Sequence, residues 1–334
     1  MKEINVIYSS DQNYKKYMGI SLTSLLENSK QYFINVKIIG LGITDSVELK
    51  QLEERYSCSI EIVDFSNWLD RLNLKKNEWD ISISSYARLF AGDMFPKLDR
   101  ALYLDCDTII CGDVYPLFSI DLSDNYVAAV IDTASNDIKE KTGMDIKNPY
   151  VNAGVLLMNL AKWRRNQVSD KFLKYIAECD GRVFHHDQGV INHVFQGKIS
   201  IVDPVYNSMT PYHTMKYDTM IKLYNVQKTY YSENEIVNAR ENPVILHYTE
   251  ALATRPWYRK STHPKRDKFE YYMKLSNWSD LEYVDDTRSL KMKLVSALYR
   301  NLPFGIASNL MKVLHNVNHI KENNWVEWAC QCGD

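Results

Sequence analysis

The sequence predicts an α/β protein built on a parallel sheet. Short runs rich in β-branched residues alternate with helix-like segments through the first hundred residues, which is the pattern of βαβ units. No internal repeat and no low-complexity linker divides these segments from the apolar runs that follow them. With 334 residues, of which 45% are hydrophobic, the chain is long enough to bury a substantial core.

The expected elements follow one another in a regular order. Four strands are expected first, at Ile4–Tyr8, Val36–Leu41, Ile60–Val63 and Ala101–Leu104. Helices are expected between them, at Ile20–Glu27 and Ser46–Tyr56. Further strand-like runs follow at Tyr126–Ile131, Val155–Met158, Ile199–Val202 and Val244–Leu246. We therefore expect residues 1–285 to form one α/β domain with helices flanking the sheet.

The remaining segment, 286–334, has a different character. Between Arg288 and Lys321 it contains no acidic residue, and its basic side chains alternate with leucines. This composition predicts a basic amphipathic helical appendage at the C-terminus. Two interpretations remain open: the helices pack on the α/β domain with their charged face in water, or residues 288–321 lie on a membrane surface.

Charge and cysteine usage limit the partners and the location. The formal net charge of −2 gives the chain no general attraction for nucleic acid, and no such partner is expected. The six cysteines form no CxxC pair and the first residues lack the order of a signal peptide, which favours a cytoplasmic protein. No apolar stretch approaches the ~20 residues needed to cross a bilayer. Any membrane contact would be peripheral, at the inner face.

An acidic motif follows the fourth expected strand. Asp105 and Asp107 stand where the apolar run ends, and ligands bind at the carboxyl edge of an open parallel sheet. Two carboxylates at that edge can hold one hard cation. The motif is not an EF-hand, because Ile110 occupies the place of the loop glycine and Pro116 that of the bidentate glutamate.

Two other functions are compatible with an isolated Asp-x-Asp motif. A metal-dependent phosphatase or phosphotransferase would use Asp105 as its nucleophile in a DxDx[TV] motif. Against this, Ile109 stands where threonine or valine is expected, and no later Gly-Asp-x-x-x-Asp motif is convincing. A sugar-nucleotide-binding protein without catalysis would carry the same acidic residues.

Seven collinear segments between residues 3 and 260 resemble the family 8 retaining glycosyltransferases, which include glycogenin and bacterial lipooligosaccharide galactosyltransferases. The segments are Val6–Tyr14, Ile83–Leu89, Leu102–Asp107, Val151–Asn159, His186–Gly189, Leu246–Tyr248 and Arg255–Trp257. The resemblance implies a Rossmann-like fold of the glycosyltransferase A type, with residues 1–285 as the catalytic domain. It also implies a Mn²⁺ ion, a UDP-hexose donor carrying glucose or galactose, a carbohydrate, glycolipid or glycoprotein acceptor, and retention of anomeric configuration.

The resemblance also implies roles for individual residues. The metal ligands would be Asp105, Asp107 and His247. The uracil and ribose would be surrounded by Ser9, Asp11, Asn13, Tyr14 and Ile81, and Arg255 would meet the diphosphate. The donor sugar would be lined by Arg88, Asp132, Asn152, Asp187 and Gln188.

These roles suit the residue types. Carboxylate and imidazole ligands suit Mn²⁺ better than Mg²⁺, which prefers oxygen donors alone. Guanidinium groups can fork to phosphate or carboxylate oxygens. Taken singly, Asp11 and Asn13 would be turn formers, His247 a hydrogen-bonded structural histidine and Arg88 a solvated charge.

Three features leave questions open. The loop Glu250–Arg255 lacks the glycine that related enzymes carry, which puts its diphosphate contacts in doubt. His185 and His186 precede the Asp-Gln pair without an assigned role. Because the amide of Gln188 is a poor nucleophile, same-face attack is favoured over a covalent intermediate, which would be sought on Asp187.

Overall fold

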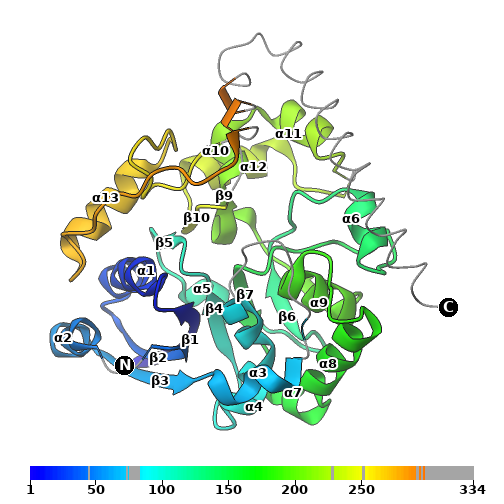
Figure 1. The fold of residues 1–334 in the computed structure, drawn as a ribbon, viewed down its shortest axis with the longest axis horizontal. Coiled ribbons are helices and arrows are strands. Elements are labelled where there is room, and N and C mark those ends of the chain that lie inside the picture. The colour runs from blue at the N-terminus through cyan, green and yellow to red at the C-terminus, as the bar shows by residue number, and fades with distance from the viewer. Residues whose placement is uncertain are drawn as a thin grey trace.

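The structure is a computed structural model that describes residues 1–43, 46–72, 74, 83–226, 229–249, 253–290, 293, 294, 296 and 297. Within these residues the chain forms a large mixed sheet with helices on both faces and a small three-stranded sheet beside it (Figure 1). The α/β class expected from the alternation of elements is confirmed.

The large sheet has the strand order β3-β2-β1-β4-β7-β6-β8. Its strands are β1 (Lys2–Asp11), β2 (Tyr32–Leu41), β3 (Cys58–Asp64), β4 (Ala101–Leu104), β6 (Val127–Ala129), β7 (Val155–Met158) and β8 (Ile199–Ile201). Neighbours pair in parallel except around β7, which runs antiparallel to both β4 and β6. The sequence does not reveal this reversal, because an apolar run looks the same in either direction.

The small sheet joins three segments that are distant in sequence. It consists of β5 (Thr108–Ile110), β10 (Ile245–His247) and β9 (Ser208–Met209), with β10 in the middle. β10 pairs antiparallel with β5 and parallel with β9. The strand expected at Val244–Leu246 therefore belongs to this sheet and not to the large one.

Helices cover both faces of the large sheet (Figure 1). The α-helices are α1 (Lys15–Glu27), α2 (Val47–Arg55), α3 (Leu69–Leu72), α4 (Ala91–Met94), α5 (Tyr115–Phe118), α6 (Asn136–Lys141), α7 (Leu160–Arg165), α8 (Val168–Glu178), α9 (His186–Phe195), α10 (Thr210–Thr214), α11 (Tyr217–Leu223), α12 (Glu233–Glu241) and α13 (Arg266–Leu275). Short 3₁₀ helices are η1 (Ser66–Trp68), η2 (Ile83–Phe90) and η3 (Pro204–Asn207). The two helices expected near the N-terminus correspond to α1 and α2.

Alternating side chains of the central strands feed two separate cores. Val6 of β1 and Leu104 of β4 belong to the core that contains α1, whereas Ile7 and Tyr103 belong to the core that contains η2, α4, α7 and α8. All four side chains are fully buried. Burial on both faces explains why β1 and β4 are nearly continuous apolar runs in the sequence.

Most of the C-terminal segment 286–334 lies outside the described residues. In the described part, Arg288 pairs with Asp286 at 3.0 Å, and Leu290 and Leu294 are 84% and 59% exposed. The domain boundary after residue 285 and the helical appendage stay predictions. Among the helices that the structure describes, none combines the length and the apolar character that a membrane span requires.

Candidate functional site

The pairing of β5 with β10 brings a distant histidine to the acidic motif. Asp105 follows β4 directly, and Asp107 immediately precedes β5. Thr108 lies opposite His247 in the antiparallel ladder, and the Tyr248 N–H donates to the Asp107 carbonyl at 2.9 Å. Because the two sheets meet here, a histidine 140 residues away from Asp107 comes to lie beside it.

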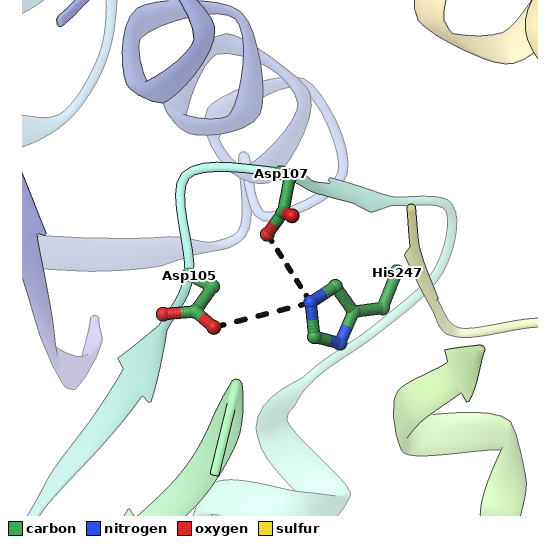
Figure 2. Close-up of side chains that lie close together, drawn as sticks. All are labelled: Asp105, Asp107 and His247. Atoms are coloured by element: carbon green, nitrogen blue, oxygen red, sulfur yellow. Dashed lines mark hydrogen bonds and ion pairs between the residues drawn. The ribbon is translucent and has the colours of Figure 1, made fainter. Parts of the chain in front are cut away.

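Figure 2 shows the His247 ring facing both carboxylates. Its Nε2 atom lies 3.1 Å from Asp107 Oδ1 and 3.9 Å from Asp105 Oδ2. One ligand atom from each of the three residues lies within 4.8 Å of the other two. Two carboxylate oxygens and one imidazole nitrogen form a donor set that fits Mn²⁺ or a similar first-row cation. We call these three residues the metal half of the site.

Burial and neighbouring charges set the protonation of the metal half. Burial raises the pKa of Asp105, although Arg88 opposes this effect. Burial also disfavours the charge on Asp107, but His247 and Arg255 outweigh it and lower its pKa to about 2. Burial alone would lower the pKa of His247, yet the adjacent Asp107 raises it overall. A cation bound between these groups would take the place of a proton on His247.

Gly154 leaves room for the metal half. A Cβ atom at this position would lie 2.2 Å from His247 Cε1 and 2.7 Å from Asp105 Oδ2. The Gly154 carbonyl accepts the Asp105 N–H at 2.8 Å, which extends the β4–β7 ladder by one bond. The backbone must approach both side chains closely here, and glycine is the residue that permits it.

Arg88 is buried between two carboxylates. Its Nη2 lies 2.8 Å from Asp105 Oδ1, and its Nε lies 2.9 Å from Asp187 Oδ2. Its Nη1 also donates to the Ala153 carbonyl at 2.6 Å. The expectation of a solvated charge for an isolated arginine is therefore wrong at this position, because two acidic partners and the carbonyls of Ser85 and Ala153 surround the guanidinium.

Three of the other residues predicted to line the donor sugar, Asp132, Asn152 and Gln188, form a hydrogen-bonded network. Together with Asp187, which forms an ion pair with Arg88, they make up what we call the sugar half. Asp132 Oδ2 accepts from Gln188 Nε2 at 2.8 Å and from Asn152 Nδ2 at 3.1 Å. The Ala153 N–H donates to Gln188 Oε1 at 3.0 Å. Asp187 and Gln188 come from the first turn of α9, and Asn152 comes from the segment before β7. The sugar half comprises Asp132, Asn152, Asp187 and Gln188.

The turn that precedes α9 has an uncommon backbone conformation. His185 and His186 both have positive φ angles, 57° and 54°. A Cβ at Gly189 would lie 2.0 Å from the Phe184 carbonyl oxygen, so glycine lets this turn close against the helix. His185 Nδ1 lies 3.0 Å from the Tyr150 hydroxyl. The two histidines without an assigned role thus shape the turn that leads into the sugar half.

Asn207 joins the two halves, and the sequence does not single it out. This fully buried residue ends η3, where its Nδ2 donates to Asn152 Oδ1 at 2.9 Å. Its Oδ1 lies 2.9 Å from His247 Nδ1. An asparagine two residues after a proline-valine pair is ordinarily a turn residue. Only its burial between the two halves distinguishes it.

Arg255, predicted to meet the diphosphate, contacts the metal half. Its Nη2 lies 3.2 Å from Asp107 Oδ2, and its Nη1 donates to the Tyr14 hydroxyl. The guanidinium carbon lies 5.5 Å from the centre of the Trp257 ring. The loop without the family glycine lies partly outside the described residues, because 250–252 are not described.

The predicted uracil and ribose residues lie at and after the end of β1. Ser9 Oγ lies 2.7 Å from the hydroxyl of Tyr103, which donates to Asp105 Oδ1 at 3.0 Å. Asp11 Oδ1 accepts the backbone N–H groups of Asn13 and Tyr14 at 2.9 and 3.0 Å, so it stabilises the turn before α1. Ile81 lies outside the described residues.

Known proteins resemble this chain over most of its length. The family description "Glycosyl transferase family 8" matches residues 5–261. The chain is 25% identical to general stress protein A of Bacillus subtilis (strain 168), over 83% of this chain and 96% of the relative. It is 28% identical to a lipopolysaccharide 1,2-glucosyltransferase of Escherichia coli, over 84% of this chain and 80% of the relative. A solved structure of an active-site mutant of LgtC matches with a TM-score of 0.68 and 25% identity, over 82% of this chain and 96% of that one.

These matches and the fold define a glycosyltransferase, an enzyme that uses a sugar-nucleotide donor and a glycan acceptor. The chain belongs to glycosyltransferase family 8. The resemblance inferred from seven short segments and the glycosyltransferase A fold that it implied are confirmed. The phosphatase alternative is set aside, because the family match covers the acidic motif together with most of the chain.

Proposed function

We propose that this chain is a retaining hexosyltransferase that moves glucose or galactose from a UDP-hexose to a glycan acceptor in the presence of Mn²⁺. The observation that carries the proposal is the convergence of Asp105, Asp107 and His247, whose ligand atoms lie within 4.8 Å of one another beside the sugar half. When bound, a Mn²⁺ ion would neutralise the charge that develops on UDP as it leaves.

Arg255 would supply a second positive charge to the diphosphate. Its guanidinium lies beside Asp107 and is held by the Tyr14 hydroxyl. A planar guanidinium can donate two parallel hydrogen bonds to phosphate oxygens. We propose that Ser9, Asp11, Asn13 and Tyr14, together with Ile81, surround the nucleoside, since the described members of this group adjoin the same edge of the large sheet.

The sugar half would bind the hexose and stabilise its positive transition state. Bond breaking to UDP gives an oxocarbenium-like carbon, which the carboxylates of Asp132 and Asp187 would stabilise. Arg88 holds Asp187 in place through the 2.9 Å ion pair. Gln188 is neutral and bonded to Asp132, so it is a weak candidate for a nucleophile.

We therefore propose same-face attack. The acceptor oxygen forms a bond to the anomeric carbon while the bond from that carbon to UDP breaks, and the departing phosphate takes the acceptor's proton. A covalent intermediate would instead leave a hexose on a side chain. Incubation with a UDP-hexose followed by intact-mass measurement tests this step, and a trapped sugar on Asp187 would overturn it.

The acceptor that we propose is a bacterial cell-envelope glycan, and the enzyme would act in the cytoplasm at the inner face of the membrane. The lipopolysaccharide glucosyltransferase relative supports this acceptor class. The exposed Leu290 and Leu294 support membrane contact through residues 288–321. Full-length protein should float with vesicles of phosphatidylglycerol but not phosphatidylcholine, and Leu290→Glu with Leu294→Glu should abolish flotation.

UDP release from a panel of UDP-sugars, with and without Mn²⁺, tests the central proposal. We expect Mn²⁺-dependent release for one donor, lost in both Asp105→Asn and Asp107→Asn. Release that is independent of Mn²⁺, or that is as fast in either variant as in the wild-type protein, would contradict it. UDP binding without release, even with added glycan acceptors, would instead favour a sugar-nucleotide-binding protein.

A further inference from the structure

Four hydrogen bonds form an unbroken chain between the sugar half and the metal half. Asn152 Nδ2 donates to Asp132 Oδ2 at 3.1 Å, and Asn207 Nδ2 donates to Asn152 Oδ1 at 2.9 Å. Asn207 Oδ1 lies 2.9 Å from His247 Nδ1, and His247 Nε2 lies 3.1 Å from Asp107 Oδ1. Asn207 is the middle member of this chain and touches neither carboxylate itself.

The donor and the acceptor in each bond that links Asp132, Asn152, Asn207 and His247 can be assigned. The assignment starts from two groups that can only accept or only donate. The carboxylate of Asp132 accepts, so Asn152 must present its amide N–H groups to it. The Gly154 backbone N–H can only donate, and it lies 3.0 Å from Asn152 Oδ1, which gives the same orientation independently. Asn152 Oδ1 therefore also accepts from Asn207 Nδ2. Asn207 must then turn its own oxygen toward His247.

This orientation determines which nitrogen of His247 is available for a ligand. Asn207 Oδ1 is an acceptor, so Nδ1 must carry the hydrogen that it receives. The 3.1 Å bond to Asp107 places a second hydrogen on Nε2, and when a cation takes the place of that hydrogen, the lone pair on Nε2 faces Asp105 and Asp107. Metal-binding histidines need such a partner on the other ring nitrogen, because it fixes both the tautomer and the ring orientation.

We infer that Asn207 is a positioning residue that couples the two halves of the site. Through its oxygen it keeps His247 Nε2 directed at the cation, and through its amide it keeps Asn152 directed at Asp132. The inference rests on the proposed metal-dependent transfer and adds a residue to it. Because Asn207, Asn152 and His247 are all buried, water does not readily replace a lost bond.

Two substitutions separate the two roles of Asn207. Asn207→Leu removes the acceptor and the donor. Asn207→Asp retains an acceptor for His247 Nδ1–H but cannot donate to Asn152 Oδ1. Asn159→Leu is the matched control, because Asn159 caps α7 through the Lys162 N–H at 3.0 Å and contacts no member of the site.

The first readout is Mn²⁺ affinity of the full-length proteins, measured from the electron paramagnetic resonance signal of free Mn²⁺. We expect Asn207→Leu to weaken Mn²⁺ binding about 10- to 100-fold, the usual cost of losing a partner behind a metal ligand. Asn207→Asp and Asn159→Leu should stay within about threefold of wild type.

The second readout is the ratio of the Kd values for UDP and for the UDP-hexose, at saturating Mn²⁺. It should fall about fivefold in Asn207→Asp, which corresponds to one buried hydrogen bond.

The outcomes distinguish this inference from the proposed function. A folded Asn207→Leu variant with wild-type Mn²⁺ affinity would overturn the coupling alone. If Asn207→Leu fails to fold, Asn207→Asp decides: a loss of Mn²⁺ affinity above tenfold, or an unchanged ratio of Kd values, also overturns the coupling. Absence of Mn²⁺ binding by the wild-type protein would overturn the proposed function and this inference with it.

Discussion

The metal half and the sugar half hold their side chains by different physical means. In the metal half, titratable groups face one another at the ends of strands, and the charges of Arg88 and Arg255 balance them. In the sugar half, Asp132 is held by amide hydrogen bonds from Asn152 and Gln188. Charge therefore dominates around Asp105 and Asp107, and directional hydrogen bonding dominates around Asp132. Substitutions that alter charge alone should damage the metal half most.

Arg88 contacts both halves through Asp105 and Asp187, and its loss should have the largest effect. Arg88→Met removes the arginine that lies between the partly buried carboxylate of Asp105 and the buried carboxylate of Asp187. Removing one partner from a buried ion pair costs about 3–5 kcal/mol. We expect urea denaturation to show a fall of this size in the free energy of unfolding. Arg71→Met, which removes an exposed and loosely paired arginine, should cost under about 1 kcal/mol. If the free energy of unfolding fell equally in the two variants, the ion pairs of Arg88 would contribute no more to stability than those of the exposed Arg71.

Asp107→Asn should disable the metal half while the sugar half stays intact. The amide keeps the shape of the side chain but removes a charged ligand. Turnover should fall at least ~10²-fold, the scale for removing one strong electrostatic stabiliser. Steady-state UDP release measures it, with Asp113→Asn, an exposed aspartate on the α5 side, as control. Activity within twofold of wild type would remove Asp107 from the proposed ligand set.

Arg255→Ala should affect the cation and the nucleotide in opposite directions. Arg255 engages Asp107 Oδ2 at 3.2 Å, so its removal should strengthen binding of Mn²⁺ alone by a few-fold. The same change removes a charge-assisted contact to the diphosphate and should weaken UDP binding about tenfold. Calorimetric titrations with each ligand measure both effects, and Arg259→Ala, at an exposed arginine, is the control. If the affinities for Mn²⁺ and for UDP change in the same direction, Arg255 does not exchange its contact with Asp107 for one with the diphosphate.

Acid should loosen the small sheet, which carries His247, before the central strands of the large sheet. Burial, helped by the charge of Lys265, lowers the pKa of His213 to about 4, and burial, helped by His213, lowers that of His263 to about 3. Both histidines contact the β9 region of the small sheet, through Ser208 and Thr210.

The sign of this effect follows from proton linkage. Since the folded pKa values are below the ordinary 6.5, the unfolded chain binds more protons than the folded chain between about pH 6.5 and 4. The stability is complete above pH 6.5 and is lost as the pH falls through this window. Hydrogen exchange at pH 7 and pH 5 should therefore show larger loss of protection in β9 and β10 than in β1 and β4. Uniform loss in all four strands would contradict the expectation, and His263→Gln should reduce the difference.

The fold could be predicted from the sequence where local patterns decide it. The strand at Ala101–Leu104 and the acidic motif after it follow from an apolar run that ends in two aspartates. His247 could be connected to the motif only through the resemblance to a family. The pairing of β5 with β10 brings His247 beside Asp107, 140 residues earlier in the chain, and no local pattern records such a contact.

The arrangement of the sugar half required the structure for a similar reason. Arg88 looks like a surface charge until Asp105 and Asp187 arrive from two other segments. Asn207 has no motif, and its importance follows from two contacts made in the interior. The direction of β7 is set by its neighbours and not by its own apolar residues.

The reversal of β7 limits where the chain can tolerate insertions. Since β7 runs against β4, the residues that lead into β7 meet the residues that leave β4, and the Asp105 N–H bonds the Gly154 carbonyl at 2.8 Å. One added residue in either strand would turn the following side chains to the other face of the sheet. The connection between Asp132 and Tyr150 does not carry this register. A scan of single-residue insertions should therefore find that connection permissive and the two short strands intolerant, so that the length of the chain can vary between Asp132 and Tyr150 but not in β4 or β7.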